Sequence, residues 1–172
     1  MKQHITPTDK EWHLPEGEII VSKTDTKGRI TYGNETLIEM TGYSEEEILG
    51  KQHNVVRHPD MPRGVFHLLW ESVQAGREFN GYVKNLRKDG GFYWVLANVT
   101  PSYDNSGQIS GYYSVRRRPG QEALAVIEPL YRDMLGTEQQ AGPKEAISAS
   151  RNLLQQKLND KGVSYDEFVF AL

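Results

Sequence analysis

Alternation of apolar and polar residues predicts five strands, arranged in two blocks. Residues 19–24 and 29–32 flank a polar turn that ends in glycine, which indicates a hairpin. The second block is a three-stranded meander, because turn-forming residues separate its three apolar stretches, 79–87, 92–103 and 108–117.

Segments with helical periodicity lie between the two blocks. Asn34 suits the N-cap of a helix over residues 35–40, and a capping box at residues 44–47 opens a second short helix. Residues 63–75 repeat apolar side chains at helical spacing, so we expect this helix to bury a broad face.

The remaining chain divides into an N-terminal arm and a helical C-terminal region. Residues 1–17 are polar and are expected to form an arm or cap, docked by Trp12 and Leu14. After the last strand we expect a helix that kinks at Pro129, then a loop, then a second helix that begins at Pro143. The predicted organisation is therefore an arm (1–17), a central domain (18–118), a coupling helix (119–135) and a linker with a C-terminal helix (136–172).

Two hairpin-rich blocks around a helical insert indicate an α+β fold with an antiparallel sheet. Helices that cover one face of such a sheet leave room for a pocket between the helices and the sheet. The pattern alone predicts no more than this.

Composition narrows the function. The 172 residues carry a net charge of -3, and the densest basic run, residues 116–118, is short, so nucleic acid is not an expected partner. The chain has no cysteine, which excludes disulfides, thiolate metal sites and cysteine nucleophiles. The sequence has neither a secretory signal nor an apolar run of membrane-spanning length, so the cytoplasm is the expected compartment. The apolar end, residues 168–172, fits either a natural terminus or a chain cut before a membrane segment or partner domain.

Residues 50–62 form the candidate functional loop. They place two histidines, an arginine and an aspartate in a segment with little apolar content, and such loops carry function more often than stability. The sequence contains no Ser/His/Asp constellation or metal-ligand spacing, so an enzyme or a metal site is not expected.

Four motifs resemble those of a PAS sensory domain in order and spacing, and the resemblance extends over residues 18–118. They are Gly-Arg-Ile-Thr-Tyr-Gly-Asn, Thr-Gly-Tyr-Ser, Asn-Leu-Arg-Lys-Asp-Gly and Tyr-Trp, at residues 28–34, 41–44, 85–90 and 93–94. Residues 53–62, His-Asn-Val-Val-Arg-His-Pro-Asp-Met-Pro, resemble the FAD-binding PAS domain of the bacterial aerotaxis receptor type.

This resemblance implies a five-stranded antiparallel sheet with short helices on one face. It also implies a non-covalently bound FAD whose redox state reports respiratory electron flow. The signal would pass by conformational change to a chemoreceptor module of the HAMP or methyl-accepting type, in cis or in trans. The expected protein is a homodimer and the cytoplasmic sensor part of a receptor that contacts the membrane only indirectly.

The resemblance assigns cofactor contacts to Arg57, His58 and Asp60, with Asn34 and Asn85 as further candidates. Arg57 suits the FAD phosphates because its guanidinium can fork onto them, although an ion pair with Asp60 is an alternative. His58 could stack on the cofactor or bond to it, or could simply bond a backbone carbonyl.

Four further assignments remain open between a cofactor role and a structural one. His53 has the same alternatives as His58, and Asp60 could bind a ribose hydroxyl, aim Arg57 or cap the next helix. Trp70 could face the cofactor or belong to the core, and Asn34 is an N-cap first and a ligand second.

Strand alternation favours a cofactor role for Asn85. It shares a face with Phe79, Gly81 and Val83, so its amide could bond the pyrimidine edge of a flavin. The corresponding pocket row on the next strand is expected at residues 93, 95, 97 and 99, with Trp94 on the opposite face.

Departures from the photosensory flavin domains of the superfamily favour redox sensing. The reactive cysteine is missing, and Val95 and Arg116 stand where an asparagine and a glutamine are expected. A redox change would alter the contacts of Asn85, Ser114 and Arg116, and the helix over 121–135 would transmit the change to the output. The alternatives are a haem-binding gas sensor that uses His67 as axial ligand and a cofactor-free dimerisation module.

Overall fold

A computed structural model describes residues 5–172, which form two compact units. Residues 5–58 and 73–118 make up the first unit, and residues 59–72 and 119–172 make up the second. The first four residues of the predicted arm lie outside the described part of the chain.

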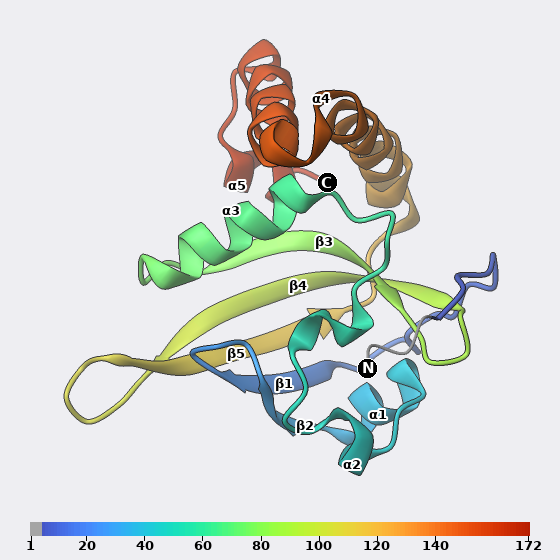
Figure 1. Cartoon of the computed structure of the whole chain (residues 1–172), viewed down its shortest axis with the longest axis vertical. Coiled ribbons are helices and arrows are strands. Elements are labelled where there is room, and N and C mark those ends of the chain that lie inside the picture. Colours follow the sequence, from blue (N-terminus) through green and yellow to red (C-terminus); the bar gives the residue numbers. More distant parts are fainter. Residues whose placement is uncertain (1–4) are drawn as a thin grey trace. The chain divides into compact units, whose positions relative to one another are not determined.

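The first unit is built on a five-stranded antiparallel sheet with the order β2-β1-β5-β4-β3 (Figure 1). The predicted α+β class and the predicted sheet are confirmed. The strands are β1 (Ile20–Asp25), β2 (Ile30–Gly33), β3 (Phe79–Leu86), β4 (Phe92–Tyr103) and β5 (Ile109–Arg117).

The register between β3 and β4 brings the predicted pocket row together. Asn85 pairs with Tyr93, and the pairs continue along the strands as Val83 with Val95 and Gly81 with Ala97. Residues directly opposite each other project from the same face, so these side chains share the inner face of the sheet.

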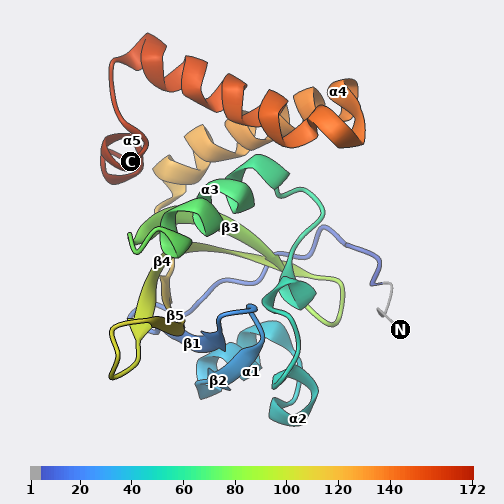
Figure 2. The ribbon, with the colours of Figure 1, turned by 60° about the vertical axis from the view of Figure 1, so that its left-hand side comes forward.

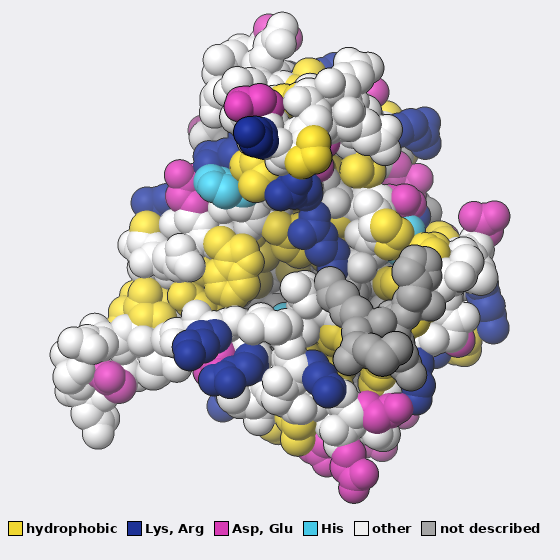
Figure 3. All heavy atoms as spheres, viewed as in Figure 1, with side chains coloured by type: hydrophobic (Ala, Val, Ile, Leu, Met, Phe, Trp, Pro, Cys, Tyr) yellow, Lys and Arg dark blue, Asp and Glu magenta, His cyan; other side chains and the backbone are white. Residues whose placement is uncertain are grey.

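Three short helices complete the first unit: α1 (Glu35–Thr41), α2 (Glu45–Ile48) and the 3-10 helix η1 (His53–Val56). Asn34 caps α1, Gly42 ends it in the left-handed region at φ 73°, and Ser44 forms the predicted capping box of α2. Figures 1 and 2 both show α1 and α2 beside β2. Acidic side chains gather over these two helices in Figure 3.

The N-terminal arm docks on the β3–β4 hairpin. The backbone N–H of Trp12 donates to the carbonyl of Phe92 at 2.7 Å, and Leu14 is fully buried. The arm passes so close that a Cβ at Gly90 would lie 2.5 Å from the carbonyl oxygen of Thr6. The glycines of this hairpin are therefore needed for docking the arm.

The second unit is helical and contains α3 (Arg63–Gln74, except for its last two residues), α4 (Gln121–Lys161) and α5 (Tyr165–Phe170). The backbone of α4 is non-helical at Gly142, with φ 77° and ψ 171°, so the helix folds into a hairpin of two arms (Figure 2). None of the helices within residues 5–172 is long and apolar enough to cross a membrane.

One detail of the C-terminal prediction was wrong. Residues 136–141 are helical, because Met134 and Glu138 continue the row of buried positions through the expected loop. The break comes at Gly142, which can take a positive φ, just before Pro143.

Candidate functional site

The candidate loop is anchored to the sheet by its backbone. The N–H of His53 donates to the carbonyl of Gly28 at 2.9 Å, and Gln52 forms an isolated bridge with Arg29 in the β1–β2 turn. A second bridge joins Arg57 to Asn85 at the end of β3. The structure therefore brings together two predicted site residues that are 28 positions apart in sequence.

His58 and Arg57 differ in their exposure to solvent. His58 is buried, and its ring meets that of Phe92 edge-on with centroids 5.9 Å apart. Arg57 keeps part of its surface exposed. A partly exposed guanidinium beside a buried ring suits a ligand that extends from the interior toward solvent.

A second polar cluster links β5, β1 and η1. Arg116 is 2% exposed, and its Nη2 donates to the hydroxyl of Ser22, which is also buried. The same hydroxyl lies 3.3 Å from Nε2 of His53. Arg116 has two further nitrogens, Nε and Nη1, that are buried and have no hydrogen-bond partner among residues 5–172.

The charges of this cluster follow from burial. Desolvation, together with the nearby Arg116 cation, lowers the pKa of His53 to about 3, so its imidazole is neutral at pH 7. Burial lowers the pKa of Arg116 to about 10, which leaves the guanidinium charged at the same pH. The cluster therefore holds one buried positive charge.

Asn85 and Tyr93 extend this polar surface across β3 and β4. Both are buried, and neither Nδ2 of Asn85 nor the hydroxyl of Tyr93 has a hydrogen-bond partner within the described residues. Burial raises the pKa of Tyr93 to about 12, although the nearby Arg116 cation opposes the rise. The Asn85 amide also acts to lower this pKa, but no hydrogen bond of normal geometry joins the two side chains.

Small residues lie beside this group. Ala97 pairs with Arg116 on one side and with Gly81 on the other, so two small residues lie next to Arg116 in the pairing. Donors without a partner among the described residues suit a ligand that presents acceptor atoms to them.

Asn34 has a structural role that occupies its whole amide. Its Oδ1 accepts from the backbone N–H groups of Leu37 and Val21, and its Nδ2 donates to the carbonyl of Ile19 at 2.9 Å. The N-cap prediction is confirmed, and the cofactor role of Asn34 stays a prediction.

The remaining predicted residues belong to the second unit. Asp60 is exposed in the turn before α3, and Trp70 is partly buried on α3. His67, on which the haem alternative rests, is exposed, and its Nδ1 lies 3.0 Å from Nη1 of Arg151. The cofactor roles of Asp60 and Trp70 stay predictions.

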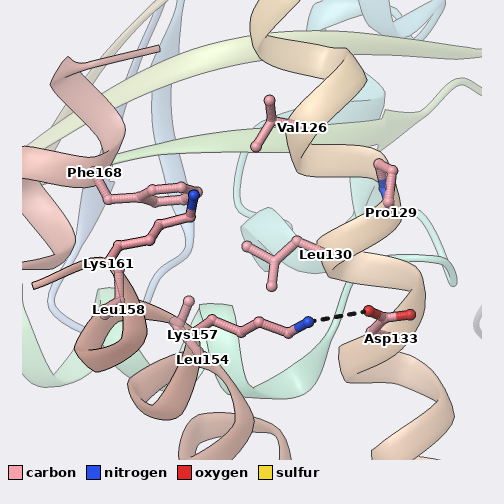
Figure 4. A pocket seen from close by; sticks show the side chains of 9 residues that line it. All are labelled: Val126, Pro129, Leu130, Asp133, Leu154, Lys157, Leu158, Lys161 and Phe168. Atoms are coloured by element: carbon pink, nitrogen blue, oxygen red, sulfur yellow. Dashed lines mark ion pairs between the residues drawn. The ribbon is translucent and has the colours of Figure 1, made fainter. Parts of the chain in front are cut away.

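The second unit also contains an apolar groove of about 190 Å³ between the arms of α4 and Phe168 of α5 (Figure 4). Its polar lining consists of Asp133, Lys157 and Lys161, and Nζ of Lys157 lies 3.8 Å from Oδ2 of Asp133. None of the predicted cofactor residues lines this groove.

The sequence-based site omitted Ser22, Tyr93 and Arg116. Strand alternation put Tyr93 in the pocket row, and the resemblance to flavin PAS domains singled out Arg116 as the counterpart of an expected glutamine. Ser22 carried no signal, because a serine in a strand is unremarkable until its neighbours are known.

Comparison with known proteins identifies the family of this chain. Residues 30–116 match the model of the PAS fold family. The aerotaxis receptor of Escherichia coli is 41% identical over 132 residues, which cover 77% of this chain and 26% of the receptor. The nitrogen fixation regulatory protein of Klebsiella pneumoniae is 26% identical over 60% of this chain and 21% of its own length.

A solved structure shows the same fold. The light-state structure of the blue-light photoreceptor Aureochrome1 LOV has a TM-score of 0.56 and 23% identity, and the match covers 70% of this chain and 91% of that one. The chain spans about a quarter of the aerotaxis receptor. Sheet order, matched residues and relatives together show that this chain belongs to the PAS fold family.

Proposed function

We propose that this chain is a redox (energy) sensor that holds FAD non-covalently in its PAS domain. The change of redox state would be passed on, by conformational change, to an output module of the chemotaxis-receptor type. The similarity to the aerotaxis receptor supports this function, and the polar inner face of the sheet supports the cofactor.

The observation that carries the proposal is the incomplete bonding of Arg116. A buried cation without full hydrogen bonding is costly, and two nitrogens of this guanidinium have no partner among the described residues. Asn85 adds an N–H donor that is likewise unsatisfied within the described part of the chain. The pyrimidine edge of a flavin carries carbonyl oxygens and ring nitrogens that accept such bonds, so the residues present fit this group.

Arg57 and His58 would bind the rest of the cofactor. The partly exposed guanidinium of Arg57 can fork onto phosphate oxygens, and the buried ring of His58 can bond or stack. The cofactor roles of Asp60 and Trp70 rest on the resemblance alone, and His53 would act through Ser22.

Bound FAD would supply a centre that accepts electrons and with them gains negative charge or protons. The Arg116 cation favours the more negative state of its surroundings. A change in the hydrogen bonds that the cofactor accepts from Arg116 would alter the bond between Arg116 and Ser22. Through Ser22 it would also alter the contact with His53. A redox event shifts the conformation only through such a difference in contacts.

The output belongs to the same proposal. A HAMP or methyl-accepting module in cis or in trans, a homodimeric assembly and a cytoplasmic location are what the similarity to the aerotaxis receptor suggests. The membrane would be involved only indirectly.

An absorbance spectrum tests the cofactor. After reconstitution with FAD, bands at about 370 and 450 nm should persist through desalting and bleach with dithionite, because the protein only tunes the cofactor's own chemistry. Arg57→Ala should weaken FAD binding by about tenfold or more, the loss expected for charge-assisted bonds. Arg117→Ala is the matched control, because Arg117 is exposed.

Two results would contradict the proposal. The first is protein that stays colourless after reconstitution. The second is a single strong band at about 400 nm, which indicates haem.

A further inference from the structure

α3 connects the sensor sequence with helices outside the family match. Residues 30–116 match the PAS family, and α3 lies within that range. Residues 59–72, which include most of α3, nevertheless form one compact unit with residues 119–172. The contacts inside this unit therefore join a PAS helix to the C-terminal hairpin of α4.

The closest approach is between Gly64 of α3 and Ser150 of α4. A Cβ at Gly64 would overlap Oγ of Ser150, so alanine at this position would displace the Ser150 hydroxyl. Ser150 is fully buried. The Ser150 hydroxyl, and not the helical backbone, therefore disfavours alanine at position 64.

Glu138 ties three segments together at this point. Its carboxylate is buried, and Oε1 accepts from the backbone N–H of Gly64 at 3.0 Å and from the hydroxyl of Ser150 at 2.6 Å. Glu138 precedes the break at Gly142 and Ser150 follows it, so one oxygen holds both arms of the hairpin and α3.

The physical chemistry of this contact makes it strong and specific. The N–H of Gly64 is in the first turn of α3, where backbone donors have no partner within the helix and a negative charge is favoured. Hydrogen bonds to a buried carboxylate are stronger than neutral ones, and losing the carboxylate would leave both donors unsatisfied.

A second contact lies further along α3. Nη1 of Arg151 is 2.7 Å from Oε2 of Glu71 and 3.0 Å from Nδ1 of His67. These groups are partly exposed, so their contribution is small. The buried carboxylate is therefore the main polar link between α3 and the hairpin.

We propose that Glu138 is a coupling residue that makes α3 and the C-terminal hairpin move as one body. A rearrangement of α3 in the sensor would then be transmitted to residues 143–161 through the Glu138, Gly64 and Ser150 contact. The structural coupling stands independently, and its use in signalling rests on the proposed function.

Hydrogen exchange tests the structural coupling without any cofactor. In Glu138→Ala, amides of residues 63–72 and 143–158 should exchange at least about tenfold faster, because two bonds to a charged group are lost. Glu128→Ala is the matched control, since Glu128 is exposed on the same helix. Exchange in Glu138→Ala that equals exchange in the wild type would overturn the proposal.

A rescue experiment covers the case in which Glu138→Ala fails to fold. Gly64→Ala should loosen the same two segments by clashing with Ser150, although alanine is the better helix former. Adding Ser150→Gly to Gly64→Ala removes the clashing atoms and should restore part of the protection in residues 63–72. No loosening in Gly64→Ala, or no rescue in the double variant, would contradict the close contact.

The signalling role is tested by exchange in oxidised and reduced protein. In the wild type, reduction should change exchange in both segments. In Glu138→Ala, the change should persist in residues 63–72 and be lost in residues 143–158. Failure of the protein to bind FAD would contradict the proposed function, but the hydrogen-exchange test without cofactor would still stand. A redox-dependent change of exchange in residues 143–158 of Glu138→Ala would overturn the coupling.

Discussion

The first unit contains two buried arginines that differ in how completely they are bonded. Arg87 is 6% exposed and Arg116 is 2% exposed. Nε of Arg87 lies 3.2 Å from Oδ1 of Asp89, and Nη1 donates to the carbonyls of Glu39 and Met40. The Arg87 guanidinium also lies 3.8 Å from the centre of the Trp12 ring.

These contacts give Arg87 a structural role. The two carbonyls belong to the last turn of α1, where acceptors lack partners within the helix, and the stacked Trp12 belongs to the arm. Arg87 therefore joins α1, the β3–β4 hairpin and the arm. Arg116, by contrast, bonds one hydroxyl, and two of its nitrogens have no hydrogen-bond partner among residues 5–172. A buried cation that is bonded to a carboxylate and to helix carbonyls indicates a structural role, and an incompletely bonded one indicates a binding site.

The largest expected effect is that of Arg87→Ala. It removes a buried cation from Asp89 and leaves two α1 carbonyls unsatisfied, so the free energy of unfolding should fall by about 3 kcal/mol. Urea denaturation measures the change. A loss similar to that of Arg117→Ala, an exposed control, would show that Arg87 is not structural.

Arg116→Met should have the opposite effect on the cofactor-free protein. Replacing an incompletely bonded buried charge with an apolar side chain should leave the free energy of unfolding unchanged or raise it by about 1 kcal/mol. FAD affinity should fall by about tenfold or more, because a charge-assisted bond is lost. Urea denaturation of FAD-free protein and FAD titration measure the two effects. A destabilisation as large as that of Arg87→Ala would show that Arg116 is structural in the same way as Arg87.

The pH dependence of stability tests the burial of His53, which lies near the Arg116 cation. Its folded-state pKa of about 3 lies below the ordinary value of 6.5, so between these values the unfolded chain binds a proton that the folded chain excludes. Its contribution to stability is therefore present above pH 6.5 and is lost as the pH falls toward 3. After allowance for partial exposure, the wild type should lose about 1 kcal/mol more than His53→Gln between pH 7 and 5.

The measurement is denaturant unfolding at several pH values. His13→Gln is the control, because His13 is largely exposed. Parallel stability profiles for the wild type and His53→Gln would mean that the imidazole is not kept neutral by burial.

The smallest effect is expected for the exposed pair next to Arg87. Nζ of Lys88 lies 2.5 Å from Oε1 of Glu47, but both side chains are more than a third exposed. Lys88→Ala should therefore lower the free energy of unfolding by about 0.5 kcal/mol or less, measured as above at two salt concentrations. A loss near that of Arg87→Ala would show that ion pairing, and not burial, separates the two cases.

Much of the fold was predictable from the sequence because its signals are local. The cap at Asn34, the capping box at Ser44 and the glycine-rich turns each depend on residues a few positions apart. Period-two alternation then placed Asn85 and Tyr93 on the inner face. The C-terminal loop was mispredicted because glycine permits a break without requiring one, and packing of the buried row kept α4 helical at Gly136.

The site was predictable only in part. The motif identified Arg57, His58 and Asn85, and the structure brings them together. It did not identify Ser22, and Arg116 lies in a run of three arginines that would normally be solvated. Whether such a side chain is buried depends on strands that are distant in sequence.

The sequence by itself therefore determined the strands, most helix boundaries and the membership of a sensory family, because each follows from short-range patterns. Only the tertiary structure decided which buried charges are satisfied. Arg116 meets Ser22 across 94 positions of the chain, and Glu138 meets Gly64 across 74. Hydrogen-bond satisfaction depends on such distant partners, and it separates a structural arginine from a candidate ligand-binding one.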